Sequence, residues 1–343
     1  MHWDPPESSC LEFRLLGPVE LYDHRSGTRT VPSGAKQRAL FAALAVRGGE
    51  VLSTERLIDE LWGERPPANA ANALQAHVAR LRRLLPRAGG DGPARALIAT
   101  HPLGYRLRTG SASTDVQRFH RLCEQGRAVV VADPAHAVEL LHRALELWRG
   151  PALDGSGRGH VCAREAERLE QGRLTALEAY HEAGLRSGRH AEACEELERL
   201  TAAHPTRERF HDLLMLALYR CGRPAEALGV YERARQRLLT EVGVGPGPAL
   251  RARMEAILCR DPELDLPWPA GPAGSTGAAS APGAATPVDL GGEIARLRER
   301  IGVLGREQEE LARRLAVLSD AFAASGSTAA PVSPVVFPAP AAH

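Results

Sequence analysis

The stretch NAANALQAHVARLRRLL, residues 69–85, has the apolar periodicity of an amphipathic helix. Its large apolar residues form one stripe at helical spacing, at Leu74, Val78, Leu81 and Leu85. The opposite face and its flanks carry only amide, imidazole, guanidinium and small side chains, at Asn72, Gln75, Ala76, His77, Ala79, Arg80, Arg82 and Arg83. Amides and guanidinium groups can pair with base edges, and small residues allow close approach, so this face predicts a DNA-reading helix. An ordinary solvated surface helix is the alternative.

The segments before this helix predict short strands and two further helices. Apolar and polar residues alternate in two strands within 11–23 and in a third over 28–31. Two helices follow, for which Ser33 and Ser53 are the predicted N-caps. The second helix ends at a glycine, so a turn over residues 63–68 leads into the opening stretch.

A β-hairpin is predicted after the helix, over residues 95–107. Because side chains alternate along a strand, Tyr105 and Leu107 are expected to point inward and Arg106 outward. Strands, three helices and a terminal hairpin over residues 11–110 indicate a winged helix-turn-helix. In such a domain the third helix enters the major groove, and the hairpin reaches the DNA backbone or the minor groove.

Charge is distributed unevenly along the 343 residues. Residues 11–110 contain 15 basic and 9 acidic side chains, whereas residues 261–343 contain 6 basic and 10 acidic ones. The positive excess of the first region suits a polyanion such as DNA. No apolar run approaches the roughly 18 residues that a membrane-spanning helix needs, and no secretory leader is recognisable. We therefore expect a cytoplasmic, nucleoid-associated protein without membrane contact.

A repeat of 34 residues organises the middle of the chain. SGRHAEA at 187–193 and CGRPAEA at 221–227 share Gly, Arg, Ala, Glu and Ala in register. A helix-turn-helix period of this length is typical of tetratricopeptide-like arrays, which bind segments of other proteins. We therefore predict an all-α domain over residues 111–260, with an earlier unit around 133–150. A purely structural helical domain is the alternative.

The end of the chain predicts a linker, a coiled coil and a tail. Residues 261–288 and 323–343 are rich in Ala and Pro and are expected to be disordered. Between them, residues 289–322 carry a heptad pattern interrupted by one glutamine, at Ile294, Leu297, Ile301, Leu304, Gln308, Leu311, Leu315 and Leu318. Isoleucine at a and leucine at d favour a parallel two-stranded coil, so we predict a homodimer. A single helix docked on its own protein is the alternative.

Side chains that could take part in catalysis or metal binding are scattered along the sequence. The six cysteines form no CxxC pair and no recognisable metal-ligand motif with histidine, so we expect buried, reduced thiols and no metal site. GSGRG at 155–159 lacks the spacing of a dinucleotide-binding loop and is interpreted as a loop. The sequence has no Walker motif, HExxH motif or nucleophile elbow. We therefore predict no catalytic residues, no cofactor and no enzyme activity.

Several motifs give the chain a specific resemblance. LWG at 61–63, VARLRRLL at 78–85 and GYRL at 104–107 resemble the DNA-binding domain of OmpR-type response regulators. They are still more similar to its variant in the Streptomyces antibiotic regulatory protein family. Three further segments resemble the second domain of that family, the bacterial transcriptional activator domain. They are STDVQRFHRL (113–122), ALELWRGPAL (144–153) and the long segment from RERFHDLL to GPALR (207–251).

The resemblance implies roles for particular residues. It implies that the helix over 69–85 reads bases and that basic groups there, Lys36 and the wing hold phosphates. The tip of the wing reads THPLGY and has no arginine, so Arg106 is the nearest basic group of the hairpin. The resemblance also implies recruitment of RNA polymerase holoenzyme and control of genes for antibiotics or other secondary metabolites.

Together these patterns predict a mainly α protein with an N-terminal winged helix-turn-helix (α+β), an all-α tetratricopeptide-like domain and a C-terminal coiled-coil helix. We expect a sequence-specific transcriptional activator that binds double-stranded DNA as two protomers on direct repeats. A flexible linker between the activator domain and the coil would allow both DNA-binding domains to reach adjacent turns of the duplex. A ligand- or peptide-sensing adaptor that acts through the helical repeats, a repressor, and an enzyme with a DNA-binding appendage are the alternatives.

Overall fold

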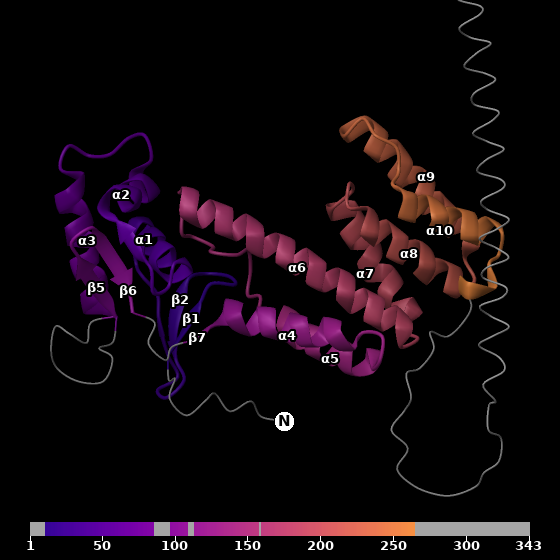
Figure 1. Cartoon of the computed structure of the whole chain (residues 1–343), viewed down its shortest axis with the longest axis horizontal. Helices are drawn as coiled ribbons and strands as arrows, with labels where there is room; N and C mark the ends of the chain where they lie inside the picture. The colour runs from indigo at the N-terminus through magenta and orange to yellow at the C-terminus, as the bar shows by residue number, and fades with distance from the viewer. Residues whose placement is uncertain (1–10, 86–96, 109–112, 158, 265–343) are drawn as a thin grey trace, which may run out of the picture. The chain divides into compact units, whose positions relative to one another are not determined.

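The computed structural model describes residues 11–85, 97–108, 113–157 and 159–264 (Figure 1). It begins with a four-stranded sheet in the order β3–β2–β1–β7. These strands are Thr28–Thr30 (β3), Glu20–Asp23 (β2), Leu11–Arg14 (β1) and Ser113–Thr114 (β7). β1 pairs antiparallel with β2 and parallel with β7. The chain therefore returns to this sheet after completing the rest of the first domain.

Three helices and a second sheet make up the winged helix-turn-helix, as predicted. The sheet has the order β4–β6–β5 and is antiparallel throughout. The elements are Ala35–Val46 (α1), Val51–Ser53 (β4), Thr54–Trp62 (α2), Ala70–Leu84 (α3), Ile98–His101 (β5) and Gly104–Leu107 (β6). The fold class that the sequence predicts for this region is confirmed.

One of the two predicted helix caps is right and the other is wrong. The Ser53 hydroxyl accepts a hydrogen bond from the Arg56 N–H at 3.2 Å, which satisfies an orphan donor of the first turn of α2. In α1 the N-cap is Gly34, one residue beyond the predicted Ser33, and it forms no side-chain cap hydrogen bond. A serine signals a helix start only to within a residue or two, because burial of the apolar face also sets where the helix begins.

The rest of the described chain is helical. Its helices are Asp115–Val129 (α4), Pro134–Leu145 (α5), His160–Arg186 (α6), His190–Ala203 (α7), Glu208–Arg220 (α8), Pro224–Glu241 (α9) and Pro248–Leu258 (α10), followed by the 3-10 turn Pro262–Leu264. The repeated glycines lie in the turns that join α6 to α7 and α8 to α9. Gly188 and Gly222 adopt left-handed φ angles of 84° and 76°, which L side chains rarely adopt.

Two hydrophobic cores fill the described residues. The first extends from the sheet through α1–α3 into α4, α5 and α6, and includes Phe13, Phe41, Leu81, Phe119 and Leu141. The second lies among the helices from α6 to α10. The first core is therefore continuous from the DNA-binding region into the start of the helical region, and the boundary at residue 110 stays a prediction.

Asp115 joins the first sheet to α4. Its buried carboxylate accepts hydrogen bonds from the Leu15 N–H at 2.8 Å and from the Leu16 N–H at 3.0 Å. Arg149, which follows α5, lies 3.4 Å from the same carboxylate and 3.1 Å from Glu20. Burial raises the pKa of Asp115 to about 6, although the backbone hydrogen bonds and Arg149 oppose the rise.

Glu60 joins α2 to α6. Its carboxylate is 5% exposed and accepts hydrogen bonds from the N–H groups of Val161 at 2.7 Å and Cys162 at 3.0 Å. The first turn of a helix has no acceptors of its own for these donors, so Glu60 acts as the cap of α6. A β-carbon on Gly159 would overlap this carboxyl group, which explains the glycine at that position.

Other sequence predictions have mixed outcomes. Cys123, Cys162 and Cys194 are buried as expected, but Cys221 and Cys259 are exposed because they lie at the ends of helices, where the apolar stripe has turned to the surface. The described residues end at 264, within the predicted linker (261–288). The predicted coiled coil (289–322) and tail (323–343) lie entirely outside them. No helix of the described chain is both long enough and apolar enough to span a bilayer.

Gly159→Ala is expected to destabilise the protein by about 1–3 kcal/mol, because the new methyl group must displace the buried Glu60 carboxylate. Gly184→Ala within α6 is the matched control, since no atom outside its chain neighbours and the backbone of its own helix lies within 4 Å of its β-carbon position. That control should instead stabilise by about 0.5–1 kcal/mol through helix propensity. Urea unfolding of both variants provides the measurement, and an equal effect of the two substitutions would contradict the capping role of Glu60.

Asp115→Asn is expected to change the pH dependence of stability. The pKa of Asp115 is raised from 3.8 to about 6, so the folded protein holds a proton that the unfolded chain has released. This contribution is fully present below about pH 4 and is lost as the pH rises through about 6. The stability of the wild type relative to the variant should therefore fall over that window, by at most about 1.4 kcal/mol per pH unit. Parallel curves for the two proteins in urea unfolding would refute the shift.

Candidate nucleic-acid interface

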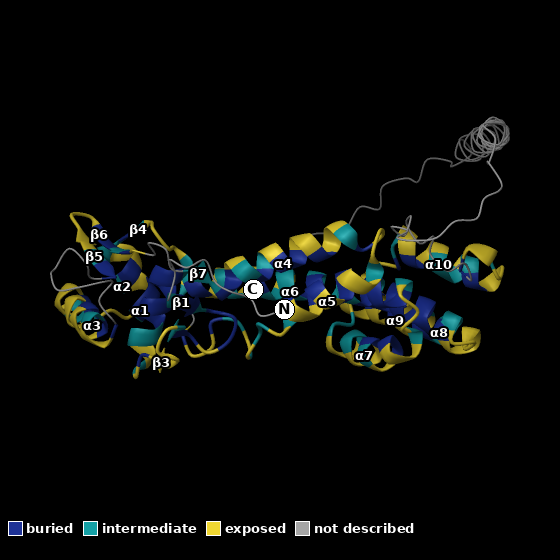
Figure 2. Ribbon diagram, turned by 90° about the horizontal axis from the view of Figure 1, so that it is seen from below, coloured by how far each residue is buried: buried dark blue, intermediate teal, exposed yellow. Residues whose placement is uncertain are grey.

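The apolar stripe of α3 holds this helix against the domain. Leu74, Val78 and Leu81 are 0–1% exposed and lie in the first core. Their burial fixes which face of the helix remains outside, because residues three and four positions apart share one face. Figure 2 shows α3 with much of its remaining surface exposed.

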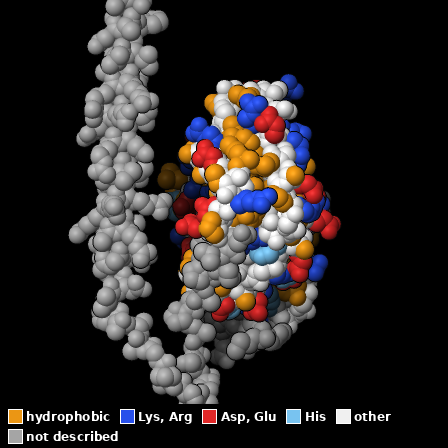
Figure 3. Space-filling view, turned by 90° about the vertical axis from the view of Figure 1, so that its right-hand side faces the viewer, with side chains coloured by type: hydrophobic (Ala, Val, Ile, Leu, Met, Phe, Trp, Pro, Cys, Tyr) orange, Lys and Arg blue, Asp and Glu red, His pale blue; other side chains and the backbone are white. Residues whose placement is uncertain are grey.

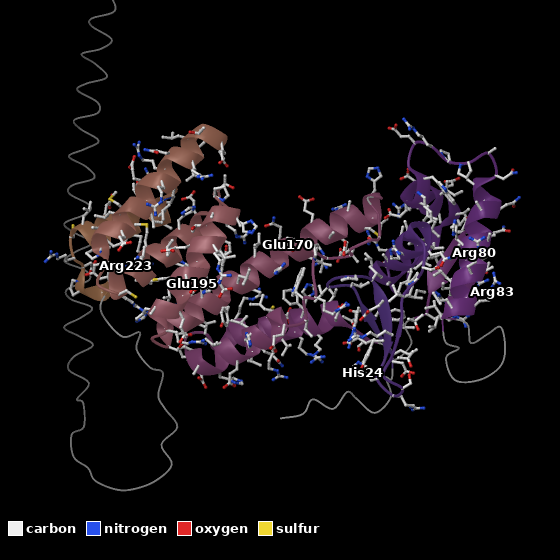
Figure 4. The ribbon with its side chains drawn as sticks, turned by 180° about the vertical axis from the view of Figure 1, so that it is seen from behind. His24, Arg80, Arg83, Glu170, Glu195 and Arg223 are labelled. Carbon is white, nitrogen blue, oxygen red and sulfur yellow. The ribbon has the colours of Figure 1, made fainter. Side chains whose placement is uncertain are left out.

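The outward face of α3 carries six of the predicted DNA-contacting residues. All six are exposed: Asn72, Gln75, Ala76, Ala79, Arg80 and Arg83. Figure 4 labels Arg80 and Arg83 on this helix. Arg83 Nε lies 3.4 Å from the Ala79 carbonyl oxygen, while its charge remains exposed. No acidic residue interrupts the helix, and its positive charge is concentrated in the C-terminal half, at Arg80, Arg82 and Arg83.

This charge pattern differs from that of other surfaces. Figure 3, which faces the α9–α10 side of the molecule, shows acidic and basic side chains together around an apolar area. Mixed charge of this kind does not attract a polyanion strongly, whereas an acid-free basic face does. The α9–α10 side therefore lacks the acid-free charge pattern of α3.

Arg82 lies beside the wing. It is half-buried, and its Nε donates to the Ile98 carbonyl at 2.9 Å while Nη2 donates to the Thr100 hydroxyl at 2.8 Å. These bonds join α3 to β5 and fix the hairpin relative to the helix. The sequence indicated a DNA contact here, and the structure gives the guanidinium a positioning contact within the protein.

Lys36 and His77 both face α2. The Lys36 ammonium group donates a hydrogen bond to the Leu61 carbonyl and lies 5.9 Å from the centre of the Trp62 ring. The His77 ring lies 6.0 Å from the same indole and is half-buried. Burial, followed by the charges of Arg80 and Lys36, lowers the pKa of His77, so the ring is neutral near pH 7. His77 thus helps to seat α3 on α2, and Lys36 joins α1 to α2.

The wing has the side-chain alternation that the sequence predicted. Tyr105 and Leu107 are buried, and Arg106 between them is half-buried. The tip is apolar, with Leu103 70% exposed. A β-carbon on Gly104 would overlap the Leu52 carbonyl, so glycine is needed where β6 meets β4.

Three features of this region were missed by sequence reasoning. Arg65 is exposed in the turn between α2 and α3. Glu60 and Asp115 hold the DNA-binding region to the helices that follow it. Their partners lie about a hundred residues away, so no local pattern could reveal them. Within the described residues no three His, Cys, Asp or Glu side chains gather to hold a metal ion.

The fold and this helix face define a DNA-binding transcriptional regulator. Two family models match successive regions of the chain. Residues 28–107 match the family described as "Transcriptional regulatory protein, C terminal", and residues 114–258 match the "Bacterial transcriptional activator domain".

Several known regulators are similar to this chain over about three quarters of its length. It is 45% identical over 258 residues to the transcriptional regulator RedD of Streptomyces coelicolor, covering 75% of this chain and 73% of RedD. It is 39% identical over 270 residues to the regulatory protein DnrI of Streptomyces peucetius, covering 78% of this chain and 98% of DnrI. The structure of Mycobacterium tuberculosis EmbR in complex with a low-affinity phosphopeptide matches with a TM-score of 0.66 and 36% identity, covering 74% of this chain and 66% of that one.

The chain therefore belongs to the Streptomyces antibiotic regulatory protein family, and it is a DNA-binding transcriptional activator.

Arg80→Ala is expected to weaken binding to a specific site by about 1–3 kcal/mol and to relax base preference, because an exposed guanidinium on the reading face is lost. Arg235→Ala on α9 is the matched control, since it removes the same charge from an exposed position paired with Glu232. Gel-shift titration against specific and scrambled duplexes measures both. Equal affinities for Arg80→Ala and the wild type would remove Arg80 from the interface.

Proposed function

We propose that this activator reads DNA in the major groove through the outward face of α3. The observation that carries the proposal is the exposed, acid-free row of amide, small and guanidinium side chains on that helix. Gln75, Arg80 and Arg83 would contact base edges, with Asn72 beside them, whereas Ala76 and Ala79 allow close approach of the helix. Arg65 and Arg106 flank the helix and would hold phosphates.

The other predicted DNA-contacting residues have other roles in this proposal. Arg82 and His77 would set the position of α3 through their contacts with the wing and α2, and Lys36 would hold α1 on α2. Their substitution would weaken DNA binding through misplacement of α3. This distinction follows from their contacts within the protein, because an engaged side chain must leave its contact before it can bind DNA.

We further propose that two protomers bind direct repeats next to a promoter and recruit RNA polymerase holoenzyme. The predicted coil over residues 289–322 would join the protomers, and the target genes would be those of an antibiotic or other secondary metabolite. The protein would act in the cytoplasm, at the nucleoid. Support comes from the family to which the chain belongs and from the heptad pattern of the sequence.

The contact between Glu60 and α6 supports a role for the helical domain in activation. α2 and α3 form the helix-turn-helix, and α2 also caps α6 through this carboxylate. A helix that is held at its first turn follows the reading helix when DNA is bound. The activator domain would thus take a defined place beside the promoter.

A cleft next to this contact favours a second candidate function, a ligand-responsive regulator. The cleft measures about 810 Å³ and is lined by residues of α2, including Arg56, and of α6, including Arg164 and Arg168. A small molecule bound there would touch both the DNA-reading and the helical region. In that case specific DNA binding would depend on the ligand.

Genome-wide occupancy of the tagged protein, followed by footprinting at the strongest site, tests the proposal. We expect paired direct repeats near promoters, spaced by one helical turn of about 34 Å. The Arg80→Ala variant is the control and should lose the footprint while its fold remains intact. Absence of specific occupancy for the wild type would contradict constitutive DNA reading and favour the ligand-responsive function. Single, isolated sites would contradict the tandem arrangement.

A further inference from the structure

The cleft beside Glu60 lies where the helix-turn-helix meets the start of α6 (Figure 1). Its volume of about 810 Å³ is within the usual range for small-molecule sites and exceeds what a lone phosphate ion needs. α1, α2 and α6 pack against one another here, so the walls come from both the DNA-binding and the helical region.

Guanidinium groups line this cleft from three elements. Arg47 is the C-cap of α1, and Arg56 lies in α2. Arg164 and Arg168 are four residues apart in α6, and His160 precedes Arg164 by the same interval. Residues four positions apart share one face of a helix, so these three side chains form a row along the α6 wall.

Two of the arginines are available to a ligand. Arg56 and Arg164 are exposed, and their guanidinium groups have no hydrogen bond or ion pair to any other described residue. Arg47 and Arg168 each lie near a carboxylate, at 3.7 Å and 2.6 Å, but their side chains are 47% and 57% exposed. Ion pairs with this much exposure are weak, so an anion can compete for these two arginines as well.

The carboxylates that line the cleft differ in what they bind. Glu60 accepts hydrogen bonds from the first turn of α6, and Glu165 is bonded to Arg168. Asp59 is exposed, three residues after Arg56 on α2, and its carboxylate accepts no hydrogen bond from another described residue. A matching ligand therefore combines an anionic group for the arginines with a hydroxyl or amino donor for Asp59.

Apolar side chains complete the lining. They come from α1, β4 and α6, at Val46, Leu52 and Val161. Sites for small organic molecules combine apolar walls with a few polar groups that fix orientation. The cleft therefore suits a ligand with an organic body better than a bare inorganic anion.

We propose that this cleft binds a phosphorylated small molecule with a hydroxylated, partly apolar body, of about the size of a nucleoside diphosphate. Guanidinium groups on two helices can both pair with the oxygens of a multiply charged phosphate group, whereas a single carboxylate occupies one guanidinium when it binds in the bidentate manner. The proposal rests on the ligand-responsive candidate function and supplies the chemical class of its ligand.

The ligand would join α2 to α6 by a contact additional to that of Glu60. Arg56 belongs to the helix-turn-helix and Arg164 to the helical region, so a molecule held by both restrains one relative to the other. α2 also packs on α3, which carries the proposed base contacts. Because coupling between two sites is reciprocal, DNA would change the affinity for the ligand by the same factor as the ligand changes that for DNA.

Isothermal titration calorimetry of the full chain with adenosine diphosphate tests the site. We expect saturable binding of one molecule per chain, and weaker binding of inorganic pyrophosphate, which has the charge without the organic body. Arg56→Ala and Arg164→Ala should each weaken adenosine diphosphate binding by about tenfold, because each removes charge-assisted hydrogen bonds to the phosphates.

Arg199→Ala is the matched control. Arg199 lies in α7, away from the cleft lining, and is likewise exposed and without an ion pair among the described residues. This variant should bind adenosine diphosphate as the wild type does. The three variants should melt with the wild type in the absence of ligand, since none of these guanidinium groups is bonded to another described residue.

Gel-shift titration with and without saturating adenosine diphosphate, at matched ionic strength, separates the site from its effect. A change of about fivefold or more in DNA affinity supports the ligand-responsive function. If adenosine diphosphate binds through Arg56 and Arg164 without such a change, the site stands and the ligand-responsive function is wrong. The site is overturned if adenosine diphosphate does not bind, if pyrophosphate binds equally well, or if Arg164→Ala and Arg199→Ala bind it with equal affinity.

Discussion

The junction between the winged helix-turn-helix and the helices that follow it depends on where the first N–H groups of α6 find an acceptor. A buried helix end leaves these donors unpaired unless another group accepts from them, and the cost of an unpaired buried donor is about 1–3 kcal/mol. Here the acceptor is the carboxylate of Glu60, which belongs to α2 of the helix-turn-helix. The Glu60 side chain therefore accepts hydrogen bonds from the first turn of α6, the longest helix described, and ties that helix to the DNA-binding region.

Asp115 repeats this arrangement at the other end of the junction. Its carboxylate accepts from two backbone N–H groups that follow β1, while its own helix, α4, begins at that residue. Both carboxylates are buried, and both are satisfied by backbone donors of another element. Such groups are costly to bury alone, which makes the geometry of each junction specific. The winged helix-turn-helix and the activator domain are held together by contacts of this kind as well as by the continuous first core.

The residues of α3 divide into those that position the helix and those that face solvent. Its apolar stripe and its half-buried basic residues fix the helix in place, and its exposed basic residues make no contact that would prevent them from meeting a ligand such as DNA. Arg80 and Arg82 are two positions apart on one helix, yet the first is exposed and the second is bonded to the wing. A regulator needs both kinds of residue, because a base contact is specific only when the helix that carries it is rigidly positioned.

Much of this protein was determined by its sequence alone. The periodicity of Leu74, Val78 and Leu81 determined α3 and its outward face, and the glycines of the 34-residue repeat determined the turns after α6 and α8, because both depend on residues close together in the chain. Only the tertiary structure decided that Arg82 and Lys36 are bonded within the protein and that Glu60 and Asp115 are junction residues. The physical reason is that hydrogen bonds between distant segments depend on packing, which leaves no periodic trace in either partner.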